Sequence, residues 1–126
     1  MRELTRAEEQ VMQVLWKIEK GFVKDILVHF DDPKPAYNTV STIVRILQDK
    51  GFVTHKAYGR THEYFPLISK QEYAKMHLKI FIKDYFSDSS VKMAGFLAGE
   101  KIISARDMEE TIKIMDAEIN RQKSKK

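Results

Sequence analysis

One short β-rich stretch limits the folds open to this chain, because it follows three segments with helical patterns. Residues 52–57 and 60–65 favour strands, and Tyr58-Gly59 between them is a turn signal. Pro66 can only end the second strand or leave it at an edge. The two runs therefore predict an antiparallel hairpin.

Apolar residues at spacings of three and four predict three helices before this hairpin. The first, about 5–19, opens with a capping box at residues 5–8. The second, about 23–30, ends at the proline-containing segment 31–35, because proline opposes helix at its own position and at the preceding one. The third spans about 38–51. Three short helices followed by a hairpin are the order of a winged helix.

Helical patterns continue after the hairpin. They predict helices at about 70–86 and 91–98 and a last helix that opens at Ser104. We expect the basic residues 121–126 to be a frayed tail. The chain is therefore expected to be mainly α with a small antiparallel β-hairpin.

The last helix carries an apolar stripe with spacings of four, three and four residues, which is typical of a helix-pairing seam. Its members are Met108, Ile112, Met115 and Ile119. The C-terminal segment is too short for a core of its own, so we expect the stripe to join two copies. The alternative is that it packs within its own chain, against Ile80 and Phe81. The expected organisation is a winged-helix DNA-binding domain over 1–69 and a helical dimerisation domain over 70–126.

Basic residues gather in one part of the sequence. Residues 34–62 contain five cations and one acid, Asp49, a surplus equal to the net charge of +4 of the whole chain. The five cations are Lys34, Arg45, Lys50, Lys56 and Arg60. Basic charge concentrated in one segment is the footprint expected for phosphate binding.

The polar face of the third helix has the features of a helix that enters the DNA major groove. Such a helix needs small residues at its leading end, hydrogen-bonding tips and a cation for phosphates. The residues that meet this description are Tyr37, Asn38, Thr39, Ser41, Thr42 and Arg45. Lys56 and Arg60 bracket the expected hairpin turn, where a flanking phosphate or minor groove would lie. The alternatives are a merely solvated helix face and a hairpin tip that is basic for solubility, and the features together favour DNA binding.

The sequence indicates no catalytic residues, metal site or cofactor. Its histidines, His29, His55, His62 and His77, lack metal-ligand spacing, and no nucleophile motif or phosphate loop is present. With a two-residue turn at Tyr58-Gly59, His55 and His62 face each other across the hairpin, but a metal site needs further ligands. We therefore expect no enzyme activity.

Three absences bear on location. The chain has no cysteine, no apolar signal-peptide segment at its start, and no apolar stretch of about 18 residues. We expect a cytoplasmic protein that does not insert into a membrane.

Several motifs along the chain resemble the penicillinase-repressor (BlaI/MecI) family of bacterial winged-helix regulators. They are Leu4-Thr5-x-x-Glu8 with Val11-Met12 and Leu15-Trp16, then Tyr37-Asn38-Thr39-Val40-x-Thr42, Leu47-x-x-Lys50-Gly51-Phe52-Val53 and Tyr64-x-Pro66-Leu67. The resemblance is strongest over 4–69. It implies a homodimer that binds a two-fold operator and represses transcription, in the setting of antibiotic or cell-wall stress. Its recognition residues would be Asn38, Thr39, Ser41 and Thr42.

The resemblance also bears on how repression is relieved. Known members are cleaved at an Asn-Phe bond after a membrane-bound sensor is triggered, which would add an upstream sensor or protease as a partner. Here Gly95-Phe96 replaces that bond. Copper-responsive relatives use C-terminal cysteines, so their thiolate chemistry is excluded.

A second function class is open to the same fold. Winged helices also serve as protein-interaction modules without sequence-specific DNA binding. That function predicts an apolar exposed surface on the third helix.

Overall fold

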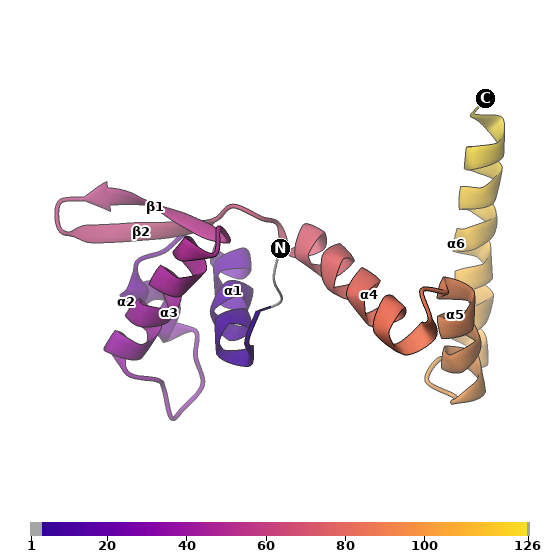
Figure 1. Ribbon diagram of the computed structural model, residues 1–126, viewed down its shortest axis with the longest axis horizontal. Helices are drawn as coiled ribbons and strands as arrows, with labels where there is room; N and C mark the ends of the chain where they lie inside the picture. The colour runs from indigo at the N-terminus through magenta and orange to yellow at the C-terminus, as the bar shows by residue number, and fades with distance from the viewer. Residues whose placement is uncertain (1–3, 126) are drawn as a thin grey trace. The chain divides into compact units, whose positions relative to one another are not determined.

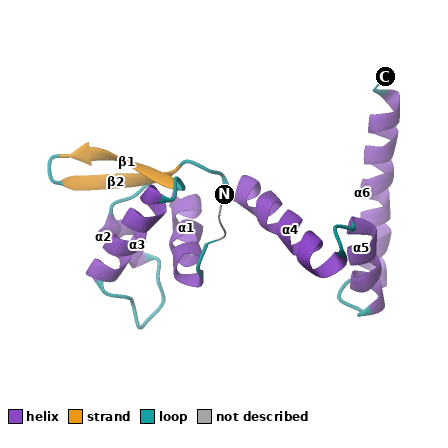
Figure 2. Ribbon diagram, in the orientation of Figure 1, coloured by secondary structure: helices purple, strands orange, loops and turns teal. Residues whose placement is uncertain are grey.

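The computed structural model describes residues 4–125, and its contacts divide the chain into two compact units, residues 1–77 and 78–126. The elements are α1 (Arg6–Ile18), α2 (Val23–Val28), α3 (Tyr37–Asp49), β1 (Val53–Tyr58), β2 (Thr61–Pro66), α4 (Lys70–Phe86), α5 (Ser90–Gly99) and α6 (Ala105–Ser124) (Figure 1). The expected order of three helices, a hairpin and three helices is confirmed, and the fold is mainly α with one two-stranded antiparallel sheet (Figure 2).

The core of the N-terminal unit joins α1, α2, α3 and the start of the hairpin. Fully buried apolar side chains come from one face of each helix. Phe52 and Val53, at the start of the hairpin, are also fully buried and complete the core. The helical members are Val11, Met12, Leu15, Ile26, Val40, Val44 and Leu47. Their spacing of three and four residues leaves the opposite face of each helix in solvent.

The loop after α1 is bound to the hairpin. Gly21 and Tyr64 exchange two backbone hydrogen bonds, of 2.9 and 2.8 Å. A Cβ at position 21 would lie 2.8 Å from Cδ1 of Ile18 and 3.2 Å from Cβ of Asp25, so a larger residue would require the Ile18 side chain to move.

The expected hairpin turn at Tyr58-Gly59 is wrong by one residue. Tyr58 pairs with Thr61, so Gly59 and Arg60 form the turn. Gly59 has a φ of +64°, and the Thr61 hydroxyl donates to the Tyr58 carbonyl oxygen at 2.9 Å, which together fix this turn. The partner of His55 is consequently Tyr64 and not His62.

The N-terminal unit extends into α4. The Tyr73 ring is 5% exposed and lies 5.7 Å from the ring of Trp16 and 5.9 Å from that of Phe52. The Trp16 indole N–H donates to the Ile68 carbonyl oxygen at 2.9 Å. These contacts extend the unit to residue 77, eight residues beyond the domain boundary expected from the sequence.

The C-terminal unit differs in having no buried residue among 78–125. The Phe86 ring contacts those of Phe81 and Phe96, yet many apolar side chains remain in solvent. The expected fraying from residue 121 is wrong, because α6 continues to Ser124. Glu118 accepts from Arg121 and Gln122, and the Ser124 hydroxyl donates to the Asn120 carbonyl, so this last turn is held by side-chain bonds.

Candidate nucleic-acid interface

The polar edge of α3 faces away from the protein. Tyr37, Asn38, Thr39, Thr42 and Arg45 are all exposed, and Ser41 is half-buried. The opposite face of the same helix carries Val40, Val44 and Leu47, which are fully buried. The helix is therefore anchored along one side and free to meet a ligand along the other.

Two polar side chains of this edge are already bonded within the helix. The Thr42 hydroxyl donates to the Asn38 carbonyl oxygen at 2.9 Å, and Nε of Arg45 donates to the Ser41 carbonyl oxygen at 3.4 Å. Thr42 can thus offer a ligand its methyl group and an acceptor, because its only donor is used. The Asn38 side-chain amide has no hydrogen bond within the described residues, so its two N–H donors and its carbonyl acceptor are available to a ligand.

The hairpin places its cations at and near the tip. Arg60 lies in the turn itself, and Lys56 is exposed on β1 with Nζ 5.3 Å from the centre of the Tyr58 ring. Tyr58 in turn packs edge-on against Phe22, with ring centres 5.9 Å apart. The tip is consequently supported by the segment that opens α2.

A hollow of about 440 Å³ lies between α2, α3 and the hairpin. It brings together four of the expected residues, Tyr37, Ser41, Arg45 and Arg60. It also adds Lys24, Thr61, His62 and Tyr64, with Phe22 and Val23 completing the wall. None of these ten residues is an acid.

Lys24 is a residue that the sequence analysis missed. It lies on α2, ten positions before the basic segment that begins at Lys34. Its only signal in the sequence is that it occupies the exposed side of a short amphipathic helix, and this does not distinguish it from other surface lysines.

The surroundings of the hollow shift the pKa of the Tyr64 hydroxyl. Burial raises the pKa of its hydroxyl above the ordinary value, although the nearby Arg45 guanidinium acts in the opposite direction. The phenol is therefore neutral near pH 7 and can donate a hydrogen bond.

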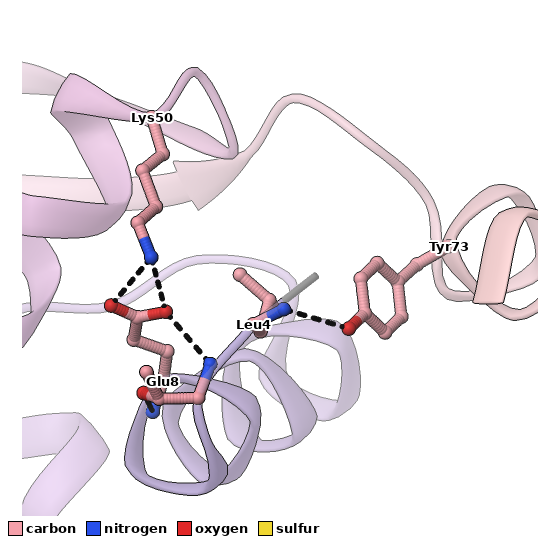
Figure 3. Close-up of polar contacts among 5 residues, drawn as sticks. Leu4, Glu8, Lys50 and Tyr73 are labelled. Carbon is pink, nitrogen blue, oxygen red and sulfur yellow. Dashed lines mark hydrogen bonds and ion pairs between the residues drawn. The ribbon is translucent and has the colours of Figure 1, made fainter. Parts of the chain in front are cut away.

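Two cations of the expected phosphate footprint are used inside the protein. Nζ of Lys50 binds both carboxylate oxygens of Glu8, at 2.7 and 2.9 Å (Figure 3). Lys34 donates to the carbonyl oxygens of Leu27 and Val28 at the end of α2 and to that of Phe30, which follows the helix. The segment's surplus of positive charge therefore overstates what is free for a ligand, and Arg45, Lys56 and Arg60 remain.

The two histidines of the hairpin, which forms the wing of the winged helix, stack without being direct cross-strand partners. The rings of His55 and His62 are 3.9 Å apart and within 5° of parallel, and Nδ1 of His55 lies 2.8 Å from Oε1 of Gln48. Among residues 4–125, no three His, Cys, Asp or Glu side chains gather as a metal site would require. This pair is therefore part of the wing's packing.

A second, larger hollow of about 910 Å³ lies against α1 and residues 66–72. It contains Glu19 and Glu72 as well as Lys17 and Lys70, so its charge is mixed. The acid-free hollow beside α3 is the better match for an anionic ligand.

The expected seam of α6 is exposed in the single chain. Ile112 and Met115 are each 59% exposed and Ile119 is 47% exposed, while Met108 is half-buried. None of the helices in the described part of the chain has the length and apolar character needed to cross a bilayer.

The sequence is similar to those of known proteins. The sequence profile of the family described as penicillinase repressor matches residues 4–117. The penicillinase repressor of Bacillus licheniformis is 24% identical over 123 residues, which cover 96% of this chain and 95% of that protein.

Solved structures are also similar to this chain. The solution structure of the DNA-binding domain of the repressor BlaI is 26% identical, covers 58% of this chain and 94% of that chain, and has a TM-score of 0.49. A complex structure of hsRosR-S4 is 18% identical, covers 94% of this chain and 93% of that chain, and has a TM-score of 0.53, which supports the fold. Because the family profile spans nearly the whole sequence, this chain belongs to the penicillinase repressor family of winged-helix, DNA-binding transcriptional repressors, which are not enzymes.

Proposed function

We propose that this protein represses transcription as a homodimer bound to a palindromic operator. The α3 helix of each subunit would lie in the major groove of one half-site. The observation that carries the proposal is the exposed polar edge of α3 beside an acid-free hollow shared with the hairpin. Asn38, Thr39, Ser41 and Thr42 would read bases, because short polar side chains and methyl groups match the major-groove pattern. Arg45, Lys56 and Arg60 would hold phosphates.

Dimerisation is inferred from the C-terminal unit. Residues 78–125 bury none of their side chains, and a unit of this size needs added apolar contact to be stable. The alternative that the α6 stripe packs within its own chain is not supported, because Ile112, Met115 and Ile119 stay about half exposed or more. A second copy seated on this stripe would remove that surface from water and link two α3 helices in one assembly.

The upstream control belongs to the proposal as well. Family resemblance suggests a response to antibiotic or cell-wall stress in the cytoplasm, with a membrane sensor or protease as the trigger. The bond that corresponds to the family's cleavage site, Gly95-Phe96, lies within α5. A protease would have to unwind this helix before cutting it.

The proposal is tested by selecting bound sequences from a random pool of DNA duplexes. We expect a palindromic consensus with half-sites about one helical turn, or a multiple of it, apart. Binding to mixed DNA should also fall with salt, with a log–log slope of about −0.9 per phosphate neutralised. Enrichment of no sequence, together with salt-independent binding, would favour the protein-interaction module. The exposed face of α3 argues against that module, since it is mostly polar.

A further inference from the structure

The acid-free hollow has a composition that the reading of bases does not explain. Its three cations come from three elements: Lys24 from α2, Arg45 from α3 and Arg60 from the hairpin turn. Within residues 4–125, none of the three pairs with a carboxylate. Like charges gathered without a counter-charge repel one another, so the site gains when an anion enters it.

The remaining wall residues suit an ester of phosphate. The neutral Tyr64 supplies a hydroxyl group of the kind that commonly donates to phosphate oxygens, while the Thr61 hydroxyl already donates to the Tyr58 carbonyl oxygen. The rings of Phe22 and Tyr37 supply apolar surface of the kind that packs on a sugar. A volume of about 440 Å³ exceeds that of one phosphate group and falls within the range of about 300–1,000 Å³ typical of small-ligand sites.

We propose that this hollow is a binding site for one sugar-phosphate unit, and that Lys24 is a binding residue of it. The inference rests on the proposed function, since the expected source is a backbone phosphodiester of the operator, held where the duplex passes between α3 and the hairpin. It adds α2 to the interface. Because three elements meet at one phosphate, this contact would fix the position of the wing relative to the recognition helix.

The experiment removes the negative charge of the DNA phosphate and the positive charge of the lysine, separately and together. Each backbone phosphate of the selected duplex is replaced, one at a time, by an uncharged methylphosphonate, and binding is measured for wild type, Lys24→Ala and Lys75→Ala. Lys75 is a matched control, because it is an exposed lysine of the same unit that lies outside the hollow. Thermal melting of the three proteins should be the same, since both lysines are exposed.

We expect wild type to lose about tenfold in affinity at one phosphate of each half-site, as for a hydrogen-bonded charge pair. Lys24→Ala should bind the natural duplex about tenfold more weakly and should lose less affinity than wild type from the methylphosphonate at that position, because only Arg45 and Arg60 then remain at that phosphate. Lys75→Ala should behave as wild type. The proposal is overturned if Lys24→Ala binds the natural duplex normally, or if its loss multiplies with the methylphosphonate loss at every position.

A second arm identifies the source of the phosphate and needs no operator. Wild type and Lys24→Ala are titrated with thymidine monophosphate by calorimetry, in the absence of DNA. Saturable binding that Lys24→Ala abolishes would support the site and assign it to a free phosphate ester. If wild type selects no DNA consensus, the proposed function fails. The titration alone then tests whether the hollow binds a phosphate ester, and absence of nucleotide binding would overturn the proposed site.

Discussion

Glu8 and Lys50 join the start of α1 to the end of α3. The Lys50 ammonium lies 2.7 and 2.9 Å from the two carboxylate oxygens of Glu8, and Lys50 is the C-cap residue of α3 (Figure 3). One oxygen of Glu8 also accepts from the Thr5 backbone N–H at 2.9 Å, within the capping box of α1. The same carboxylate therefore caps one helix and fixes the other.

Glu8→Gln should destabilise the protein by about 2–3 kcal/mol, because it leaves the Lys50 ammonium partly buried without its counter-charge. The side chains of Glu8 and Lys50 are only 7% and 16% exposed, so water replaces the lost carboxylate poorly. Urea unfolding followed by Trp16 fluorescence would measure the change.

The matched control for this variant is Glu110→Gln. Glu110 pairs with Lys113 at 3.8 Å, and both side chains are more than 60% exposed, so the loss should be about 0.5 kcal/mol or less. Equal losses in the two variants would show that burial of the Glu8 pair is unimportant.

The same pair predicts how stability depends on pH. Burial raises the pKa of Glu8, but the hydrogen bonds from Lys50 and Thr5 outweigh it and hold the pKa below its ordinary value of 4.5. A carboxyl whose pKa is lowered by folding stabilises the protein above its unfolded pKa and loses that contribution as pH falls through its folded pKa. Wild type should therefore lose stability below pH 4.5 more steeply than Glu8→Gln, as followed by urea unfolding at a series of pH values. Parallel curves would contradict the assignment.

Much of the fold follows from the sequence, since the apolar spacing in α1 and α3 and the β-rich runs determine the elements and their order. The capping box at Thr5 and Glu8 was also predictable, because it depends on residues three positions apart. The hairpin register was not. It depends on Gly59 adopting a positive φ and on the Thr61 hydroxyl bonding to Tyr58, and the turn signal at Tyr58-Gly59 is compatible with either register.

The candidate site was predictable where it lies on one helix and unpredictable where it joins several. The exposed edge of α3 follows from helical periodicity. Lys34 and Lys50 were assigned to the ligand, although Lys34 bonds to carbonyls of α2 and Lys50 to a carboxylate 42 positions away. Lys24 was omitted for the same reason, because only the fold brings α2 beside Arg45 and Arg60. A lysine's partner is a matter of tertiary position, which charge counting along the chain does not capture.

Thr42 should read DNA through its methyl group, because its hydroxyl donor is bonded to the Asn38 carbonyl oxygen. Thr42→Val keeps the methyl and should bind the selected duplex within about twofold of wild type. Thr42→Ser keeps the hydroxyl and should lose about 0.8 kcal/mol, the value of one buried CH₂ group. Affinities from a fluorescence-anisotropy titration would decide, and the reverse order of the two variants would assign base reading to the hydroxyl.

Asn38 should read bases, whereas Lys56 should bind phosphate. Asn38→Ala should lose about 1–3 kcal/mol on the selected duplex and little on random DNA. Lys56→Ala should weaken both duplexes alike and reduce the magnitude of the salt slope by about 0.9. Titrations at several salt concentrations separate the two patterns. If both variants lose equally on both duplexes, α3 does not read sequence.

Substitution of the α6 stripe should separate the dimer and leave the N-terminal unit, which has its own buried core, folded. Ile112→Asp with Ile119→Asp puts two charges into the seam, and each buried isoleucine is worth about 1.5–3 kcal/mol. The dimer should therefore dissociate at least about 100-fold more readily in sedimentation equilibrium. Ile114→Asp is the control, because Ile114 is 67% exposed and lies on the opposite side of the helix from Ile112. Since two linked subunits bind two half-sites through their effective concentration, the double variant should also release the operator while Ile114→Asp retains it. A double variant that stays dimeric would place the contact between copies on some other surface, and the exposed stripe of α6 would then need a different partner.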